Sequence, residues 1–92
     1  MDITWDPEKA RTNVEKHSVS FSDAEPVLFD PYGITVEDEF IDAEQRFVTI
    51  GIDALKRILV VVYTYRGESI RLISARLADR QEEKDYETGI WL

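Results

Sequence analysis

The most informative segment of the chain reads ILVVVYTYRGESIRLISARL, residues 58–77. Its first eight residues are nearly all β-branched or aromatic, which is the composition of a β-strand. Gly67 and Glu68 then supply a two-residue turn with glycine in the first position, and residues 69–77 return as the partner strand. This turn predicts three facing pairs in the hairpin: Arg66 with Ser69, Thr64 with Arg71, and Leu59 with Arg76.

The hairpin has two faces, because side chains alternate along a strand. One face is apolar, and we expect it to lie under the helices; it carries Ile58, Val60, Val62, Ile73, Ala75 and Leu77. The other face mixes aromatic, apolar and charged side chains, which makes it a candidate binding face. It carries Leu59, Val61, Tyr63, Tyr65, Ile70, Leu72, Ser74 and Arg76.

Weaker strand signals precede the hairpin. Residues 46–52 alternate between apolar and polar, and residues 53–56 form the turn that leads into the hairpin. Residues 34–37 predict a short strand, which an acidic loop connects to residues 46–52. Residues 2–5 form an extended lead-in that we expect to be an edge strand.

Two helices are predicted near the N-terminus. Asp6 and Pro7 open the first, because aspartate accepts from free backbone N–H groups and proline is tolerated at the first helical position. One face of this helix presents Ala10, Val14 and His17. Ser22 and Glu25 have the spacing of a capping box for a second, short helix through about residue 29.

Asp79 and Glu82 open a final helix through about residue 88, with Gly89 as its stop. The sequence therefore predicts an α+β fold: an antiparallel sheet of about four strands, with two N-terminal helices and one C-terminal helix mostly on one side of it. We expect residues 1–92 to form a single domain.

The composition excludes several classes of protein. The chain has no cysteine and one histidine, which excludes disulfides and cysteine- or histidine-rich metal sites. We expect neither a metal nor a cofactor. The first residues do not resemble a signal peptide, and no apolar run approaches the roughly 20 residues of a membrane helix. We therefore expect a cytoplasmic protein without membrane contact.

The formal net charge of −8 argues against a nucleic-acid-binding protein. However, the acidic residues crowd into residues 37–44 and 79–87, and four arginines lie between or beside these clusters: Arg66, Arg71, Arg76 and Arg80. This distribution allows a local basic strip. The acidic clusters are either solvated or serve as docking sites for a basic segment of a partner.

Ordered motifs over almost the whole chain resemble the BrnT family of toxins. The most specific are KHSVSF (residues 16–21) and IRLISAR (residues 70–76), accompanied by WDP (residues 5–7) and FDP (residues 29–31). The resemblance implies a RelE-like ribonuclease fold, RNA cleavage that arrests growth, and neutralisation by a BrnA-type antitoxin. It also implies that operator DNA is bound only through the antitoxin. We expect a homodimer or a heterotetramer with the antitoxin.

The chain departs from the family pattern at two places. Ser18 stands where the family often has a glycine that ends the first helix. The final helix is acidic, whereas the family tends to have arginines there, which bears on RNA binding.

Metal-free RNA cleavage needs a base for the 2′-hydroxyl, cations for the phosphorane, and an acid for the leaving oxygen. Arginine binds phosphate with two hydrogen bonds, and histidine exchanges protons near neutral pH. The expected catalytic residues are His17, Arg66, Arg71 and Arg76, and the expected RNA-binding residues are Lys9, Lys16, Arg46 and Tyr65. Further candidates for proton transfer are Glu44, Tyr63 and Tyr65.

These residues also have structural interpretations. His17 could be a half-buried structural histidine, Arg76 could pair with a nearby carboxylate, and Tyr65 could pack on the sheet. For the whole protein, the alternative is a catalytically weak or inactive module that mainly binds the antitoxin. The acidic charge favours this module, and the intact stretch of residues 71–76 favours the enzyme.

Overall fold

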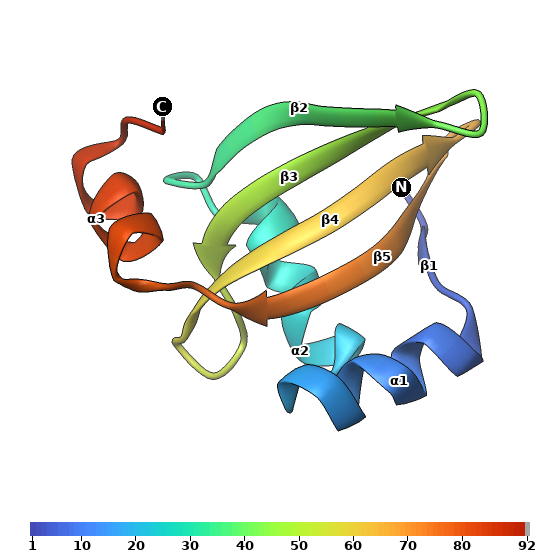
Figure 1. Cartoon of the computed structure of the whole chain (residues 1–92), viewed down its shortest axis with the longest axis horizontal. Coiled ribbons are helices and arrows are strands. Elements are labelled where there is room, and N and C mark those ends of the chain that lie inside the picture. The colour runs from blue at the N-terminus through green and yellow to red at the C-terminus, as the bar shows by residue number, and fades with distance from the viewer. Residues whose placement is uncertain (92) are drawn as a thin grey trace.

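The protein is described by a computed structural model that covers residues 1–91. Its strands form one sheet in the order β1-β5-β4-β3-β2 (Figure 1). The strands are β1 (Ile3–Thr4), β2 (Ile34–Ile41), β3 (Glu44–Ile52), β4 (Ile58–Arg66) and β5 (Ser69–Leu77). The helices are α1 (Pro7–His17), α2 (Phe21–Ala24), the 3₁₀ helix η1 (Glu25–Phe29) and α3 (Arg80–Thr88).

The predicted α+β class is confirmed, but the predicted antiparallel sheet of about four strands is wrong in detail. The sheet has five strands within residues 1–91 and is mixed, because β1 pairs with β5 in parallel. Ile3 lies opposite Ile70, and the backbone N–H of Ile70 donates to the carbonyl of Asp2 at 2.8 Å. The expected edge strand at residues 2–5 is therefore present, and it extends the sheet beside β5.

The predicted acidic loop after residue 37 is also wrong. Residues 37–39 belong to β2, which continues to Ile41 with a register shift between Glu37 and Phe40. The turn to β3 consists of Asp42 and Ala43, whose φ angles are 51° and 62°. Two successive positive φ angles match the twist of a tight hairpin, so the strands pair up to the turn and no loop is needed.

The predicted register of the β4–β5 hairpin holds only near its turn. Arg66 pairs with Ser69 and Thr64 with Arg71, as expected, but the register shifts beyond Tyr63, and Leu59 pairs with Leu77 instead of Arg76. The shift leaves Ile73 as an extra residue, a β-bulge, between Leu72 and Ser74. A bulge inverts the alternation of faces, and local sequence patterning did not reveal it.

The face expected under the N-terminal helices is wrong for β4 and for the first half of β5, and right for Ala75, which lies beyond the bulge. The main core beneath α1, α2 and η1 contains Leu59, Val61 and Tyr63 of β4 together with Ile70, Leu72 and Ala75 of β5. The opposite face forms a smaller core of Val48, Ile50 and Val60, against which Tyr86 and Trp91 pack. Both faces of β4 are apolar because both are covered, so alternation alone could not assign them.

This second core also corrects the expectation that the helices lie mostly on one side. Figure 1 shows α1 beside β5, whereas α3 lies apart from α1 and α2, near the end of β3. The hydroxyl of Tyr86 on α3 donates to Asp30 at 2.6 Å. Helix α3 thus packs on the face that carries Val60, opposite the face covered by α1, α2 and η1.

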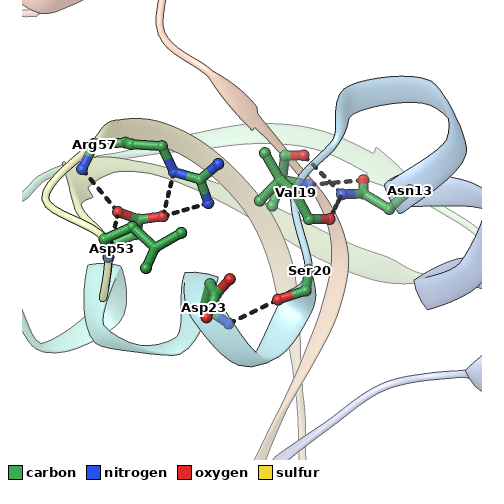
Figure 2. Close-up of polar contacts among 8 residues, drawn as sticks. Asn13, Val19, Ser20, Asp23, Asp53 and Arg57 are labelled. Carbon is green, nitrogen blue, oxygen red and sulfur yellow. Dashed lines mark hydrogen bonds and ion pairs between the residues drawn. The ribbon is translucent and has the colours of Figure 1, made fainter.

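The helix ends follow simple capping rules. Asp6 caps α1 as predicted, and α3 has the predicted capping box of Asp79 and Glu82 and ends at Gly89. The capping residue of α2 is Ser20 instead of Ser22, because the Ser20 side chain accepts from the Asp23 N–H at 3.1 Å (Figure 2). No helix within residues 1–91 combines the length and apolar character needed to cross a membrane.

Candidate functional site

Two adjoining pockets lie between α1 and the sheet. The first, which we call the cationic pocket, is lined by Lys9, Ile41, Asp42, Glu44, Arg46, Thr64, Arg66, Arg71 and Ile73. The second, the helix pocket, has a volume of ≈ 280 Å³ and is lined by Glu8, Lys9, Thr12, Asn13, Lys16, His17, Ile73 and Ser74. Because Lys9 and Ile73 line both, the two pockets adjoin, and together we call them the α1–β5 groove.

Strand pairing gathers the arginines of the cationic pocket. Arg46 on β3 pairs with Thr64 on β4, and Thr64 pairs with Arg71 on β5. Residues that lie directly opposite one another share a face of the sheet, and neighbouring strands are about 4.8 Å apart. Arg66 is two residues beyond Thr64 on the same strand and points to the same face. Three strands therefore direct three guanidinium groups at one site.

The cationic pocket is locally basic although the protein is acidic. Four cationic side chains line it, against the two carboxylates of Asp42 and Glu44. Glu44 is held by Arg66, whose Nη2 donates to Oε1 at 3.0 Å and whose Nε donates to Oε2 at 3.3 Å. The remaining cations, Lys9, Arg46 and Arg71, leave an excess of positive charge that can hold an anion such as phosphate.

Asn13 fastens α1 to the edge of β5 and so places the helix pocket. Its side-chain oxygen accepts from the Ala75 N–H at 3.0 Å, and its nitrogen donates to the carbonyls of Ala75 at 2.8 Å and Val19 at 2.9 Å (Figure 2). Strand β1 ends at Thr4, and the Asn13 amide makes with Ala75 the backbone hydrogen bonds that a further neighbouring strand would make with β5. As a result, Lys16 and His17 of α1 face Ser74 across the groove.

The bulge at Ile73 determines which β5 side chains share a face. Arg71 and Arg76 are five residues apart and would point to opposite faces of a regular strand. The extra residue brings both to the same face, since Arg71 pairs with Thr64 and Arg76 pairs with Val60. A bulge that redirects side chains is a frequent feature beside active sites.

Arg76 nevertheless does not line either pocket. Both of its terminal nitrogens donate to Glu82 of α3, at 2.8 and 2.9 Å, and its side chain is 43% exposed. The hydrogen bond from Arg76 lowers the pKa of Glu82, against the opposing effect of burial, and the same hydrogen bond raises the pKa of Arg76. The structure therefore shows the ion-pair arrangement that the sequence offered as the alternative for Arg76.

Tyr65 lies on the opposite face from the groove. It pairs with Ile70 of the main core, and its ring packs edge-on against Phe47 and Tyr63 at centroid distances of 5.3 and 6.0 Å. Burial raises the pKa of Tyr65, and the neighbouring Tyr63 adds to the shift. Tyr65 is thus part of an aromatic cluster on the sheet and is separated from the other candidate residues.

The groove therefore collects six of the eight candidate residues: Lys9, Lys16, His17, Arg46, Arg66 and Arg71. Glu44, a further candidate for proton transfer, also lines the groove, together with eight residues that the sequence did not name as site residues: Glu8, Thr12, Asn13, Ile41, Asp42, Thr64, Ile73 and Ser74. Thr12 could have been found, because Lys9, Thr12 and Lys16 have the spacing of one helix face. Ile73 could not, because its position in the groove depends on the bulge.

Comparisons with known proteins agree with the resemblance stated above. Residues 5–82 match the model of a family described as "Ribonuclease toxin, BrnT, of type II toxin-antitoxin system". Among solved structures, the chain is similar to the crystal structure of the Brucella abortus ribonuclease toxin BrnT, with a TM-score of 0.70 and 30% sequence identity. The similarity covers 87% of this chain and 99% of that one. A comparison with curated protein sequences gave no match.

Proposed function

Because the chain belongs to the BrnT family of ribonuclease toxins from type II toxin–antitoxin systems, we propose that it cleaves RNA in the α1–β5 groove without a metal ion. The observation that carries this proposal is the convergence of α1, β3, β4 and β5 on one basic groove within an acidic protein. We propose that this cleavage arrests growth, and that the fold is related to the RelE-like toxins.

Lys9, Arg46 and Arg71 are the groups that hold the RNA backbone in this proposal. They leave the pocket basic after Arg66 and Glu44 have paired. Binding of single-stranded RNA by three cations predicts that the logarithm of affinity falls with the logarithm of salt concentration at a slope of about −2. Lys16 extends the phosphate path along α1.

His17 and the arginines supply the chemistry. The imidazole can give a proton to the 5′ oxygen that leaves, and a guanidinium beside the phosphate stabilises the charge that develops on the phosphorane. Arg71 is placed to stabilise the phosphorane, because Arg71 and its strand partner Thr64 both line the cationic pocket. Arg66 adds to it through Nη1, the terminal nitrogen that it does not use for Glu44.

Arg76 takes part only after Glu82 has released it. The two groups pair through both terminal nitrogens of Arg76, so a phosphate must compete with a carboxylate for the same donors. We expect Arg76→Ala to weaken growth arrest, in part by releasing α3 from the sheet.

The test is RNA cleavage by the purified protein, free of any partner, in the presence of a chelator. We expect the parent to cleave and both His17→Ala and Arg71→Ala to lose activity by a factor of about 10² or more. Arg80→Ala is the matched control, because Arg80 is an exposed arginine at the start of α3 and does not line the groove. Equal cleavage by Arg71→Ala and Arg80→Ala would show that the groove is not the place where RNA is cleaved.

The partner that we propose is a BrnA-type antitoxin, which inhibits the toxin and carries the contact with operator DNA. Family membership supports an antitoxin partner in general. Co-purification with the antitoxin encoded beside the toxin, followed by mass measurement in solution, tests this proposal. The expected assembly is a homodimer or a heterotetramer with the antitoxin.

A second candidate function is a module that binds the antitoxin and cleaves RNA weakly or not at all. The specific observation that favours it is the acidic α3, which has no basic residue in its last turn and whose Glu82 holds Arg76. A folded parent that binds the antitoxin but leaves RNA intact would select this function.

A further inference from the structure

We infer that Glu44 is the base that accepts the 2′-hydroxyl proton of the RNA, and that Arg66, besides its contact with the phosphate, orients this carboxylate. This inference rests on the proposed ribonuclease function, because it assigns a step of that reaction. The observation behind it is a carboxylate that accepts two hydrogen bonds from Arg66 and lines a pocket with an excess of cations.

Glu44 is half-buried and fixed in direction. Its side chain is 34% exposed, against 55% for Arg66, and both of its oxygens accept from the Arg66 guanidinium. Glu44 and Ile41 form the last pair before the β2–β3 turn, so the backbone beneath the carboxylate is also held by strand pairing. A carboxylate with two oxygens offers about four acceptor positions. The Arg66 fork occupies one on each oxygen and leaves the others for a hydroxyl donor.

The other carboxylate of the cationic pocket is a poorer candidate for the base. Asp42 is exposed and lies in the turn, where its backbone has a φ of 51°. The Asp42 side chain makes no hydrogen bond within residues 1–91, whereas the Glu44 carboxylate accepts two from Arg66. Proton transfer needs a group held at hydrogen-bond distance from the reacting hydroxyl, and this favours the carboxylate whose orientation is set by a partner.

The acid and the base then belong to different pockets of one groove. Glu44 lines the cationic pocket, His17 lines the helix pocket, and Lys9 and Ile73 lie at the junction of the two. In the proposed reaction a phosphate binds at Lys9, with the Glu44 carboxylate on the side of the cationic pocket and the His17 imidazole on the side of the helix pocket. In-line displacement at phosphorus needs this arrangement, because the attacking and leaving oxygens lie on opposite sides.

The proposed reaction is an attack of the RNA 2′ oxygen on the neighbouring phosphorus. The 2′ oxygen forms a bond to phosphorus while its proton passes to the Glu44 carboxylate. The bond from phosphorus to the 5′ oxygen breaks, and that oxygen takes a proton from the His17 imidazolium. The products are a 2′,3′-cyclic phosphate and a free 5′-hydroxyl, and no oxidant, reductant or metal takes part.

Steady-state cleavage of one RNA oligonucleotide by parent, Glu44→Gln and Glu44→Asp tests the inference. Glu44→Gln keeps the shape and can still accept from Arg66, but it cannot take a proton. We expect kcat to fall by about 10²–10⁴. KM is expected to stay equal or fall, because a negative charge has left the RNA site. Glu44→Asp, which keeps the carboxylate, is expected to retain more activity than Glu44→Gln.

The pH dependence separates a base from a structural residue. In the parent, kcat/KM is expected to decline toward acid pH as the base becomes protonated, and this limb is expected to disappear in Glu44→Gln. Arg66→Gln is expected to lower kcat while the acid limb remains. Glu39→Gln, which removes the same charge from an exposed position on β2, is the matched control and is expected to match the parent.

The outcomes distinguish this inference from the proposed function. If the parent and Glu44→Gln cleave RNA at the same rate, Glu44 is not the base and the ribonuclease function stands. The same holds if Asp42→Asn, and not Glu44→Gln, abolishes the acid limb. If the folded parent cleaves no RNA, the proposed function and this inference are both overturned.

Discussion

Replacement of Asn13 by alanine tests the contact that holds α1 against the sheet. Asn13 is 4% exposed, and its amide makes three hydrogen bonds to the backbone, two with Ala75 and one with Val19 (Figure 2). Alanine leaves the N–H of Ala75 and the two carbonyls without these partners. The Ala75 N–H loses its one acceptor, whereas each carbonyl keeps a second lone pair.

The expected loss of stability follows from these three groups. A buried polar group left unpaired costs about 1–3 kcal/mol. The helix pocket borders Asn13, so water can reach part of the gap and the lower end of this range applies. We therefore expect Asn13→Ala to reduce the free energy of unfolding by about 3–4 kcal/mol. At about 0.05–0.15 kcal/mol per residue, the whole protein has roughly 5–14 kcal/mol.

Urea unfolding followed by the fluorescence of Trp5 and Trp91 measures this loss. Val14→Ala is the matched control on the next position of α1, because Val14 is 47% exposed and its truncation is expected to cost less than about 0.5 kcal/mol. Asn13→Asp is expected to cost at least as much as Asn13→Ala, since a carboxylate would face two carbonyls. A loss below about 1 kcal/mol for Asn13→Ala would refute the reasoning, because each unpaired group alone is expected to cost that much.

Three further predictions concern stability and pH. Ser18→Gly is expected to raise the free energy of unfolding by about 0.5–1 kcal/mol in urea titrations, because Ser18 ends α1 at a φ of 57°, where glycine is unstrained; an unchanged midpoint would contradict this. Gly51→Ala is expected to lower the free energy of unfolding by about 1–3 kcal/mol, since the added Cβ would lie 3.0 Å from the Val27 carbonyl oxygen. Thermal unfolding measures this loss, and an unchanged stability would contradict it by showing that η1 moves to make room for the methyl group. The pKa of Glu82 is lowered, mainly by the hydrogen bond from Arg76. The stability that this carboxylate contributes is therefore present above its unfolded pKa and is lost as pH falls through its folded pKa. Acid titration of Trp91 fluorescence is expected to show α3 loosening as pH falls below the ordinary range of a glutamate carboxyl, and Arg76→Gln is expected to show a smaller acid effect.

Most secondary structure was predictable because its signals are local. The cap at Asp6, the capping box of Asp79 and Glu82, and the turn at Gly67 all depend on residues within four positions of each other. The strand limits of β5 were predicted correctly at both ends. The motif at Ser20 was misread because Ser22 and Glu25 have the same spacing as a capping box, and only the backbone distinguishes the two serines.

Family membership was also readable from the sequence, and so were several of the residues that line the groove, although Arg76 and Tyr65 lie outside it. The motifs at residues 16–21 and 70–76 contain His17 and Arg71, and the comparisons agree with the family. Net charge was a poor guide, because four cations converge on one pocket against two carboxylates, while most of the acidic residues lie elsewhere. Average charge says nothing about where strand pairing places individual side chains.

Local sequence thus determined the elements, their caps and the family, because propensity, capping and motifs act over a few residues. Tertiary structure decided the faces of the sheet, the bulge at Ile73, the pairing of Arg76 with Glu82, and the separation of Tyr65 from the groove. Each of these depends on contacts between distant segments. Both faces of β4 are apolar, and one extra residue in β5 moves every side chain beyond it to the other face. The alternation of the sequence therefore fits both assignments of the sheet faces, and only the packing of α1 and α3 decides between them.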